Sequence, residues 1–312
     1  MLKYVLKRLG YILVTLWVIV TCTFFMMKNL PGTPFDAERF SIMTPQQQER
    51  ELEMYGLNDS LPMQYVKYIK NMLKGDLGTS FTYVNQDVSK VITGRLGPSA
   101  LIGIQAVLIG LAIGLILGIL AAWKHNSGID YFTMILAVLG VSVPNFVAAA
   151  LLQYYIGLKW GALPVGFWTG WNCSVLPSIA LSFSATAMVA RFMRTEMLDV
   201  LDQDYIVTAR AKGLSQMKVL MRHAVRNSIL PVVTILGPIV VNLMTGSLAV
   251  ENIFSIPGIG SLFVDCIKAN DYPVIMGITI FYAAFYMLIV LLVDLAYSLI
   301  DPRIRLAKGK ES

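Results

Sequence analysis

The sequence predicts an all-α, polytopic membrane protein with six transmembrane helices. Its 312 residues are 56% hydrophobic and only 14% charged, whereas a soluble domain carries about 25% charged residues. The charges are clustered, and between the clusters lie six apolar runs, each long enough to cross about 30 Å of hydrocarbon as a helix of roughly 20 residues. The runs are continuous and not alternating, which favours helices over the short strands of a barrel.

The flanking residues help to define each of the six apolar runs. The first follows Lys3, Lys7 and Arg8; it is longer than the apolar core of a signal peptide and no Ala-x-Ala site follows it, so we expect an uncleaved anchor. The fourth begins after a stretch rich in Gly, Pro and Trp that we interpret as a loop. The predicted spans are 9–27, 96–123, 131–158, 175–193, a stretch within 227–250, and 272–293 with an extension to 300.

Lys and Arg gather in the connections on the side of the N-terminus. The short connections on the other side carry few of them, and the long segment 28–95 is weak evidence for orientation. The positive-inside rule therefore places both termini in the cytoplasm. It also explains the net charge of +6 without any nucleic-acid partner. We divide the chain into a tail and first span (1–30), an extracytoplasmic region (31–98) and a core with five spans (99–312).

The extracytoplasmic region mixes acids with regularly spaced Leu, Tyr, Val and Phe. This pattern predicts a structured cap with short amphipathic helices at 46–55 and 61–73.

The largest inner connection, 195–228, predicts two short helices separated at Gly213. Asp202 and Asp204 precede the first helix and Gly213 follows it, as expected of helix ends. Basic residues spaced four apart form a stripe on the second helix, at Lys218, Arg222 and Arg226. Pro231 is then expected in the first turn of the fifth span.

The inner connection resembles the EAA loop of ABC importer permeases, and in particular that of the dipeptide/oligopeptide/nickel permease family. The resemblance rests on Ala209-Arg210-Ala211-Lys212-Gly213-Leu214 and on His223-Ala224-x-Arg226-Asn227-x-x-Leu230-Pro231. Three further stretches fit the same family: Ile253-Phe254-Ser255-Ile256-Pro257-Gly258-Ile259-Gly260 followed by Asp271-Tyr272-Pro273-Val274, the tail Asp301-Pro302-Arg303-Ile304-Arg305, and Gly75-Asp76-Leu77-Gly78-x-Ser80. The likeness covers essentially the whole chain and is greatest to the B-type membrane subunit of oligopeptide permeases. The sequence departs from the general pattern at Val207, where that pattern has Glu.

This resemblance implies a type I ABC importer permease fold in a bacterial inner membrane. It implies a second, homologous permease subunit, two ATP-binding subunits, and an extracytoplasmic peptide-binding protein that delivers the peptide. ATP and Mg²⁺ would be bound by those ATPases, since this chain has no G-x-x-x-x-G-K-[ST] phosphate loop and needs no cofactor of its own. The residues that the resemblance assigns to ATPase coupling are Tyr205, Thr208, Ala209, Arg210, Ala211, Lys212, Gly213 and Leu214.

Ionisable residues in or near the spans form a second candidate set. Asp294 falls in the last run, and a carboxylate in a bilayer is expected to face a partner, a cavity or water. Arg191 and Arg194, near the inner end of the fourth span, are the candidate partners, either as a gate or as a fixed structural pair. Glu251 and Asp271, at the outer side, are candidates for contact with the binding protein.

Other residue types give weaker signals. His125 and His223 stand alone, so no metal site is predicted, and a disulfide between the outer Cys173 and Cys266 is left open. Small residues share one face of the second span, which predicts close helix packing: Gly103, Gly110, Gly114 and Gly118.

Two other classes of function predict features that this sequence lacks. An ion-driven secondary transporter would show inverted repeats with acids at the midplane, and a membrane enzyme would show a catalytic cluster; the sequence shows neither. Within the permease class, dipeptides or nickel remain alternatives to oligopeptides as cargo.

Overall fold

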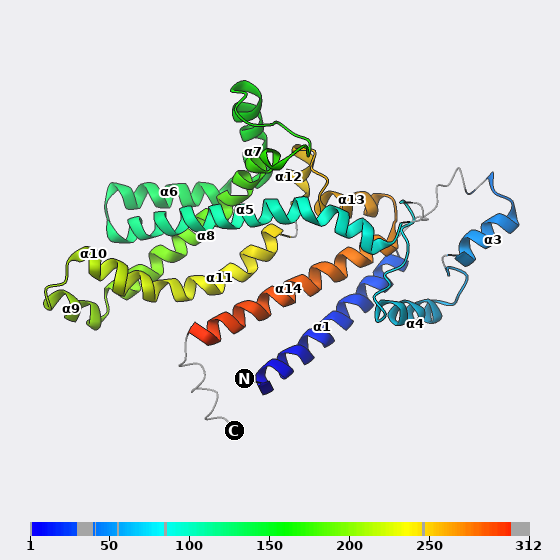
Figure 1. Cartoon of the computed structure of the whole chain (residues 1–312), viewed down its shortest axis with the longest axis horizontal. Coiled ribbons are helices and arrows are strands. Elements are labelled where there is room, and N and C mark those ends of the chain that lie inside the picture. Colours follow the sequence, from blue (N-terminus) through cyan, green and yellow to red (C-terminus); the bar gives the residue numbers. More distant parts are fainter. Residues whose placement is uncertain are drawn as a thin grey trace. The chain divides into compact units, whose positions relative to one another are not determined.

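The computed structural model describes residues 2–29, 40, 42–54, 56–83, 86–244 and 247–300 (Figure 1). The described residues form helices joined by loops, with a single bridge pairing Thr79 with Asp87. They fall into two compact units, Met1–Gly97 with Ile259–Phe285 and Pro98–Gly258 with Tyr286–Ser312. The all-α class predicted from the apolar runs is confirmed.

The first unit packs three short helices with parts of longer ones. Helix α4 has Pro62 in its first turn, where a missing N–H costs nothing. The predicted helices at 46–55 and 61–73 correspond to α3 and α4. The elements of this unit are α1 (Leu2–Lys28), α3 (Pro45–Met54), α4 (Leu61–Met72), the start of α5 (Val88–Trp123), α13 (Ile259–Lys268) and the first half of α14 (Tyr272–Ile300).

The second unit holds the rest of α5 and α14 and the helices between them. A π-helical stretch, η1, extends α7, and another, η3, leads into α11. The elements are α6 (Gly128–Ser142), α7 (Asn145–Leu152), η1 (Gln153–Lys159), the 3₁₀ turn η2 (Trp171–Ser174), α8 (Val175–Leu201), α9 (Asp204–Ala211), α10 (Gln216–Lys218), η3 (Val219–Val225), α11 (Arg226–Met244) and α12 (Leu248–Ile253).

Among the described residues, five helices are long and apolar enough to cross a membrane, and a bent pair brings the number to six if it is one span. The five are Lys7–Lys28, Val88–Trp123, Trp171–Leu201, Gln216–Ile253 and Tyr272–Val293. They coincide with five of the six predicted runs. The length and apolar composition of each run therefore predict where the chain can cross hydrocarbon.

The predicted run 131–158 is the one that departs from a straight span. It consists of two helical stretches, Gly128–Ser142 and Asn145–Lys159, that meet at an angle of 100°. Pro144 lies at the break and Val143, the residue before it, has extended backbone angles of φ −80° and ψ 118°. Proline has no N–H to continue the helix and disfavours helical geometry at the preceding residue, so the chain turns there.

Pro231 also lies differently from the expectation. It falls inside α11 and not in a first turn, because the helical path runs without interruption from Gln216 through η3 into α11. The inner connection is thus continuous with the fifth predicted span, and any displacement of this connection is carried directly into that helix.

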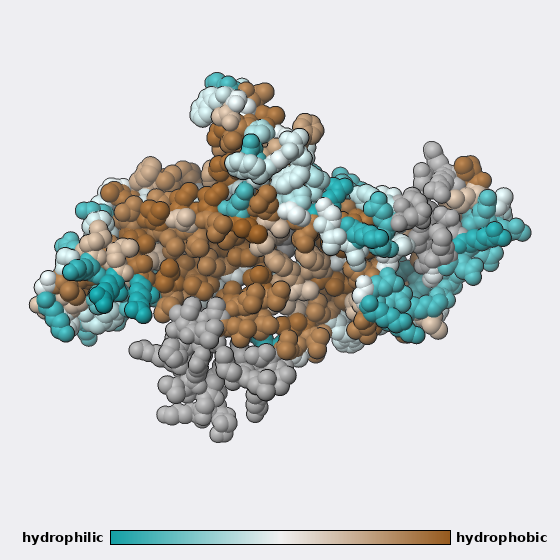
Figure 2. Space-filling model, in the orientation of Figure 1, coloured by the Kyte–Doolittle hydropathy of each residue, from teal (hydrophilic) through white to brown (hydrophobic). Residues whose placement is uncertain are grey.

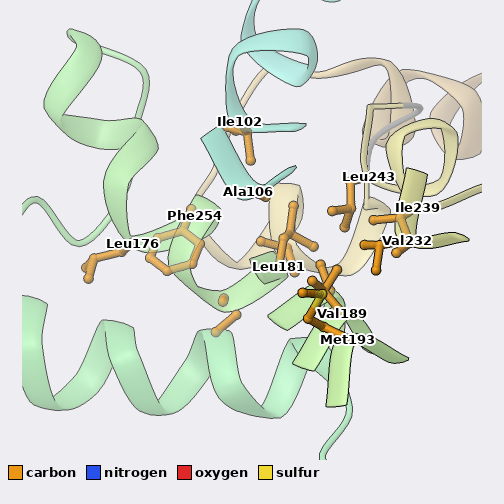
Figure 3. Close-up of a cluster of buried hydrophobic side chains, with 14 of the residues drawn as sticks. Ile102, Ala106, Leu176, Leu181, Val189, Met193, Val232, Ile239, Leu243 and Phe254 are labelled. Atoms are coloured by element: carbon orange, nitrogen blue, oxygen red, sulfur yellow. The ribbon is translucent and has the colours of Figure 1, made fainter. Parts of the chain in front are cut away.

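The core of the second unit lies between α5, α8, α11 and α12 (Figure 3). Val189 and Met193 of α8 are nearly inaccessible, at 1% and 0% exposed. The predicted glycine face of α5 packs within the chain: a Cβ on Gly118 would lie 2.6 Å from the Ala190 carbonyl oxygen, and Gly103, Gly110 and Gly114 are similarly close to α11 or α8. Helix packing, the preferred interpretation of these glycines, is confirmed.

Side-chain polarity is distributed unevenly over the second unit. Figure 2 shows hydrophobic residues over the lengths of α5, α6 and α8, and hydrophilic residues gathered at the end that holds α9 and α10. This is the distribution expected of helices that cross a bilayer with a polar connection outside it.

Candidate functional site

The inner connection forms a compact helical surface at the polar end of the second unit. Ile206 and Ala209 of α9 point inward, at 0% and 6% exposed, and pack on the buried Val219 of η3. Val200 and Leu201, at the end of α8, complete this cluster. Helix α9 is therefore seated on the ends of α8 and η3 by apolar contacts, and it is not a free loop.

Polar contacts add to this seating. The side-chain amide of Asn227 donates to the Tyr205 hydroxyl at 2.9 Å. The Ser228 hydroxyl donates to the Glu196 carbonyl at 3.2 Å and to the Ala224 carbonyl at 2.9 Å. These bonds join the start of α11 to α9 and to α8, so the three helices are linked at this end.

Gly213 ends α9 in a left-handed conformation, with φ +78°. Its N–H donates to the Arg210 carbonyl at 2.9 Å, and the N–H of Leu214 donates to the Ala209 carbonyl at 3.4 Å. This pair of bonds is a Schellman motif, which needs a residue that tolerates positive φ at the position of Gly213. The break that the sequence predicts at Gly213 is confirmed.

The outward side of this surface is mainly polar, but several apolar side chains are exposed among its basic residues. Val207 is 58% exposed, Met217 50% and Met221 53%. Arg210, Ala211 and Lys212 are exposed beside them. Exposed Met and Val on a polar end of the molecule are typical of a surface that another protein covers.

An ion pair with a buried carboxylate joins α6 to α8. Asp130, at the start of α6, accepts two bonds from the guanidinium of Arg194: from Nε to Oδ1 at 2.5 Å and from Nη2 to Oδ2 at 2.8 Å. The side chain of Asp130 is 3% exposed and that of Arg194 21%. The backbone N–H of Asn126 donates to Oδ2 at 3.0 Å and His125 Nδ1 lies 3.0 Å from it. This bidentate pair fixes the start of α6 to the inner half of α8.

The sequence predicts that Arg191 or Arg194 pairs with Asp294, as a gate or as a fixed structural pair, and Asp130 is not among the predicted partners. The structure gives Arg194 a partner in Asp130, whereas Arg191 is exposed three residues earlier. Asp294 lies on α14, but its side chain is outside the described part of the structure, as is the whole tail motif 301–305. Asp130 carried one signal in the sequence: it is an acid at the start of an apolar run, next to the basic segment of His125.

Glu251 and Asp271, the candidate contacts for a binding protein, are both buried, at 2% and 0% exposed. Glu251 accepts a hydrogen bond from the Ser99 hydroxyl at 2.7 Å. Gly258 lies directly against the Glu251 carboxylate, where a Cβ would overlap it. Each carboxylate is thus turned toward its own chain, and contact with a binding protein stays a prediction.

Asp271 joins two stretches that are far apart in the sequence. Its Oδ2 accepts hydrogen bonds from the Ser80 hydroxyl and from the Thr82 N–H, the latter at 3.0 Å. Its Oδ1 accepts from the Val274 N–H at 3.4 Å. The Gly75-to-Ser80 stretch and the Asp271-to-Val274 stretch therefore form one hydrogen-bonded element of the first unit.

We expect Ser80→Ala to destabilise the first unit by about 1–3 kcal/mol, because a buried carboxylate would lose a hydroxyl donor. Thermal unfolding of the purified chain measures this loss. Ser89→Ala, at an exposed position of α5 in the same unit, is the matched control and should leave unfolding unchanged. Equal unfolding temperatures for both variants would mean that the Ser80–Asp271 bond contributes nothing.

The three cysteines are free thiols in the structure. Cys173 and Cys266 are buried, and burial, together with the charges of Asp271 and Asp265, raises the pKa of Cys266 to about 12. In the residues described, no three His, Cys, Asp or Glu side chains lie together in a way that would hold a metal ion.

Comparison with protein families gives two matches that together cover most of the chain. Residues 114–306 match the model described as "Binding-protein-dependent transport system inner membrane component". Residues 1–96 match "Binding-prot-dependent transport system membrane comp, N-term".

Curated relatives match along nearly the full length. The chain is 46% identical to a dipeptide transport system permease protein of Lactococcus lactis, over 98% of this chain and 100% of the relative. It is 43% identical to a dipeptide transport system permease protein of Bacillus subtilis, over 99% of each. It is 39% identical to an oligopeptide transport system permease protein of Salmonella typhimurium, over 98% of this chain and 100% of the relative.

A solved structure shares the fold. It is the crystal structure of an amino acid ABC transporter with histidines, with a TM-score of 0.50, 18% sequence identity, and coverage of 76% of this chain and 98% of that chain.

Proposed function

Because the chain belongs to the family of binding-protein-dependent transport system inner membrane components, we propose that it forms one half of the transmembrane channel of a peptide-importing ABC transporter. In this proposal a second permease completes the channel, two ATPase subunits bind on the cytoplasmic side, and an extracytoplasmic protein delivers the peptide. The chain contributes no ATPase chemistry of its own. Both termini and the α9 surface lie in the cytoplasm, in agreement with the positive-inside rule.

The observation that best supports this proposal is the packing of α9 on α8 and η3. Its outward side is exposed, while its inward side is buried on α8 and η3. A short helix of this kind fits a groove of a partner. Because η3 runs into α11, and Ser228 joins α11 to α8, motion of a partner-bound α9 displaces two membrane helices as a rigid body.

The exposed apolar side chain of Val207 bears on how this surface could contact an ATPase without the glutamate of the general pattern. Val207 occupies the position where the general pattern has Glu, and it is 58% exposed. We infer that the contact with the ATPase is made by the exposed apolar side chains of Val207, Leu214 and Met217, together with the exposed Arg210 and Lys212, and not by an ion pair from residue 207.

Purification of the chain from its own membrane tests the assembly. We expect a stable complex with a second permease and two ATPases, and peptide uptake that requires ATP and the binding protein. Transport by this chain alone in liposomes, driven by an ion gradient, would overturn the proposal.

The cargo has two candidates. Oligopeptides are the prediction of the sequence analysis, and dipeptides are favoured by the names of the relatives at 46% and 43% identity. Competition of labelled dipeptide uptake by unlabelled dipeptides, pentapeptides and nickel distinguishes the alternatives, because only the true cargo class competes at low concentration.

A further inference from the structure

Helix α4 packs against α1 within the first unit. The hydroxyls of Thr21 and Tyr65 are 2.7 Å apart, and the Tyr65 ring stacks on Phe25 with ring centres 5.7 Å apart. Thr21 is seven residues before Lys28, where the apolar span ends, so it lies about 10 Å inside that end. These contacts join the first turns of α4 to the half of α1 that ends at Lys28.

An open groove of about 490 Å³ runs between these two helices. Its walls are Trp17 of α1 and Val66, Ile69 and Leu73 of α4 and the turn after it. Trp17 is 58% exposed, Val66 58% and Leu73 78%. Since α1 is itself a membrane span by length and composition, the medium that fills an apolar groove along it is lipid hydrocarbon.

Two lysines line the same groove. Lys70 and Lys74 are exposed, and none of the carboxylates that the structure describes forms an ion pair with either. Lys67, on the same helix, differs because Asp59 lies 2.5 Å from its ammonium. A lysine beside hydrocarbon extends its stem along apolar surface and places its ammonium among headgroups, where an anion is the favoured partner.

We propose that this groove binds an anionic phospholipid. An acyl chain lies along Trp17, Val66 and Leu73, and the lipid phosphate lies between Lys70 and Lys74. The two unpaired cations select an anionic lipid over a neutral one, and amphipathic helices with lysines on the polar side bind anionic membranes for the same reason. Helix α4 is thereby held in the membrane interface by lipid as well as by its contacts with α1.

Native mass spectrometry of the full complex, delipidated and titrated with phosphatidylglycerol, tests the proposal. The variant Lys70→Gln/Lys74→Gln should bind its tightest phosphatidylglycerol about 25-fold more weakly, at about fivefold for each lysine. The matched control is Lys67→Gln/Lys90→Gln, which removes the same charge from two lysines paired with Asp59 and Asp87. Equal loss in both variants, or no loss in either, would overturn the site.

A second measurement locates the lipid. A fluorophore on Leu73→Cys, in a complex whose chain carries Cys22→Ser, should be quenched by spin-labelled phosphatidylglycerol and much less so after Lys70→Gln/Lys74→Gln. Spin-labelled phosphatidylcholine should quench it weakly. If neither lipid quenches the fluorophore, another subunit covers the groove and the proposal is wrong.

Discussion

Replacing Gly213 by valine is expected to reduce peptide uptake at least tenfold while the chain still folds and assembles. The native φ of +78° is unfavourable for a β-branched residue and costs about 1–3 kcal/mol there. Valine would break the paired bonds to Arg210 and Ala209 and displace Leu214, and with it the surface proposed for the ATPase. ATP hydrolysis by the complex would continue without coupled transport.

Two variants make this result specific. Gly161→Val introduces the same strain at φ +62°, also with open space around the residue, but in the connection between η1 and η2. It should leave coupling intact. Gly213→Asn should recover most of the uptake, because asparagine tolerates the left-handed region. Normal uptake by Gly213→Val would show that the end of α9 has no part in coupling.

Removing the guanidinium of Arg194 is expected to have the largest effect on stability. Arg194→Ala leaves the buried Asp130 carboxylate without its two guanidinium bonds, and loss of one partner of a buried pair costs about 3–5 kcal/mol. Chemical unfolding of the purified chain in detergent measures the change. Arg191→Ala, three residues earlier on the same helix and exposed, is the control and should cost little.

The double variant Asp130→Ala/Arg194→Ala distinguishes two causes of the lost stability, an unpaired buried charge and lost packing of the arginine stem. Because it removes both charges, it should be more stable than Arg194→Ala alone. If the double variant were as unstable as the sum of the two single variants, the pair would be uncoupled and the loss would come from packing of the arginine stem.

The sequence predicted well what depends on local composition. Run length and lack of charge placed the spans, because hydrocarbon thickness sets the length of a crossing helix. The end of α9 was predicted from Gly213 alone, since few residues adopt the required φ. The break at Pro144 had the same kind of local signal, but no local signal gives the 100° angle between two helices that both pack on α8.

What the sequence did not predict were contacts between distant residues. Asp130 and Arg194 are 64 positions apart, and Ser80 and Asp271 are 191 apart. No periodicity or spacing joins such pairs. The sequence suggested a partner for Arg194 in Asp294, whereas the fold pairs Arg194 with Asp130. For the same reason Glu251 and Asp271 were expected at a surface, whereas each is enclosed by its own chain.

A cytoplasmic ATPase can bind α9 only if α9 lies on the cytoplasmic side of the membrane. Cysteine at Lys212, in a chain with Cys22→Ser, is the direct probe, and cysteine at the exposed Lys268 of α13 is the opposite-side control. A membrane-impermeant maleimide applied to intact cells should label position 268 and spare 212, which reacts only after permeabilisation and is protected by bound ATPase. Labelling of position 212 from outside intact cells would contradict the assignment of this surface.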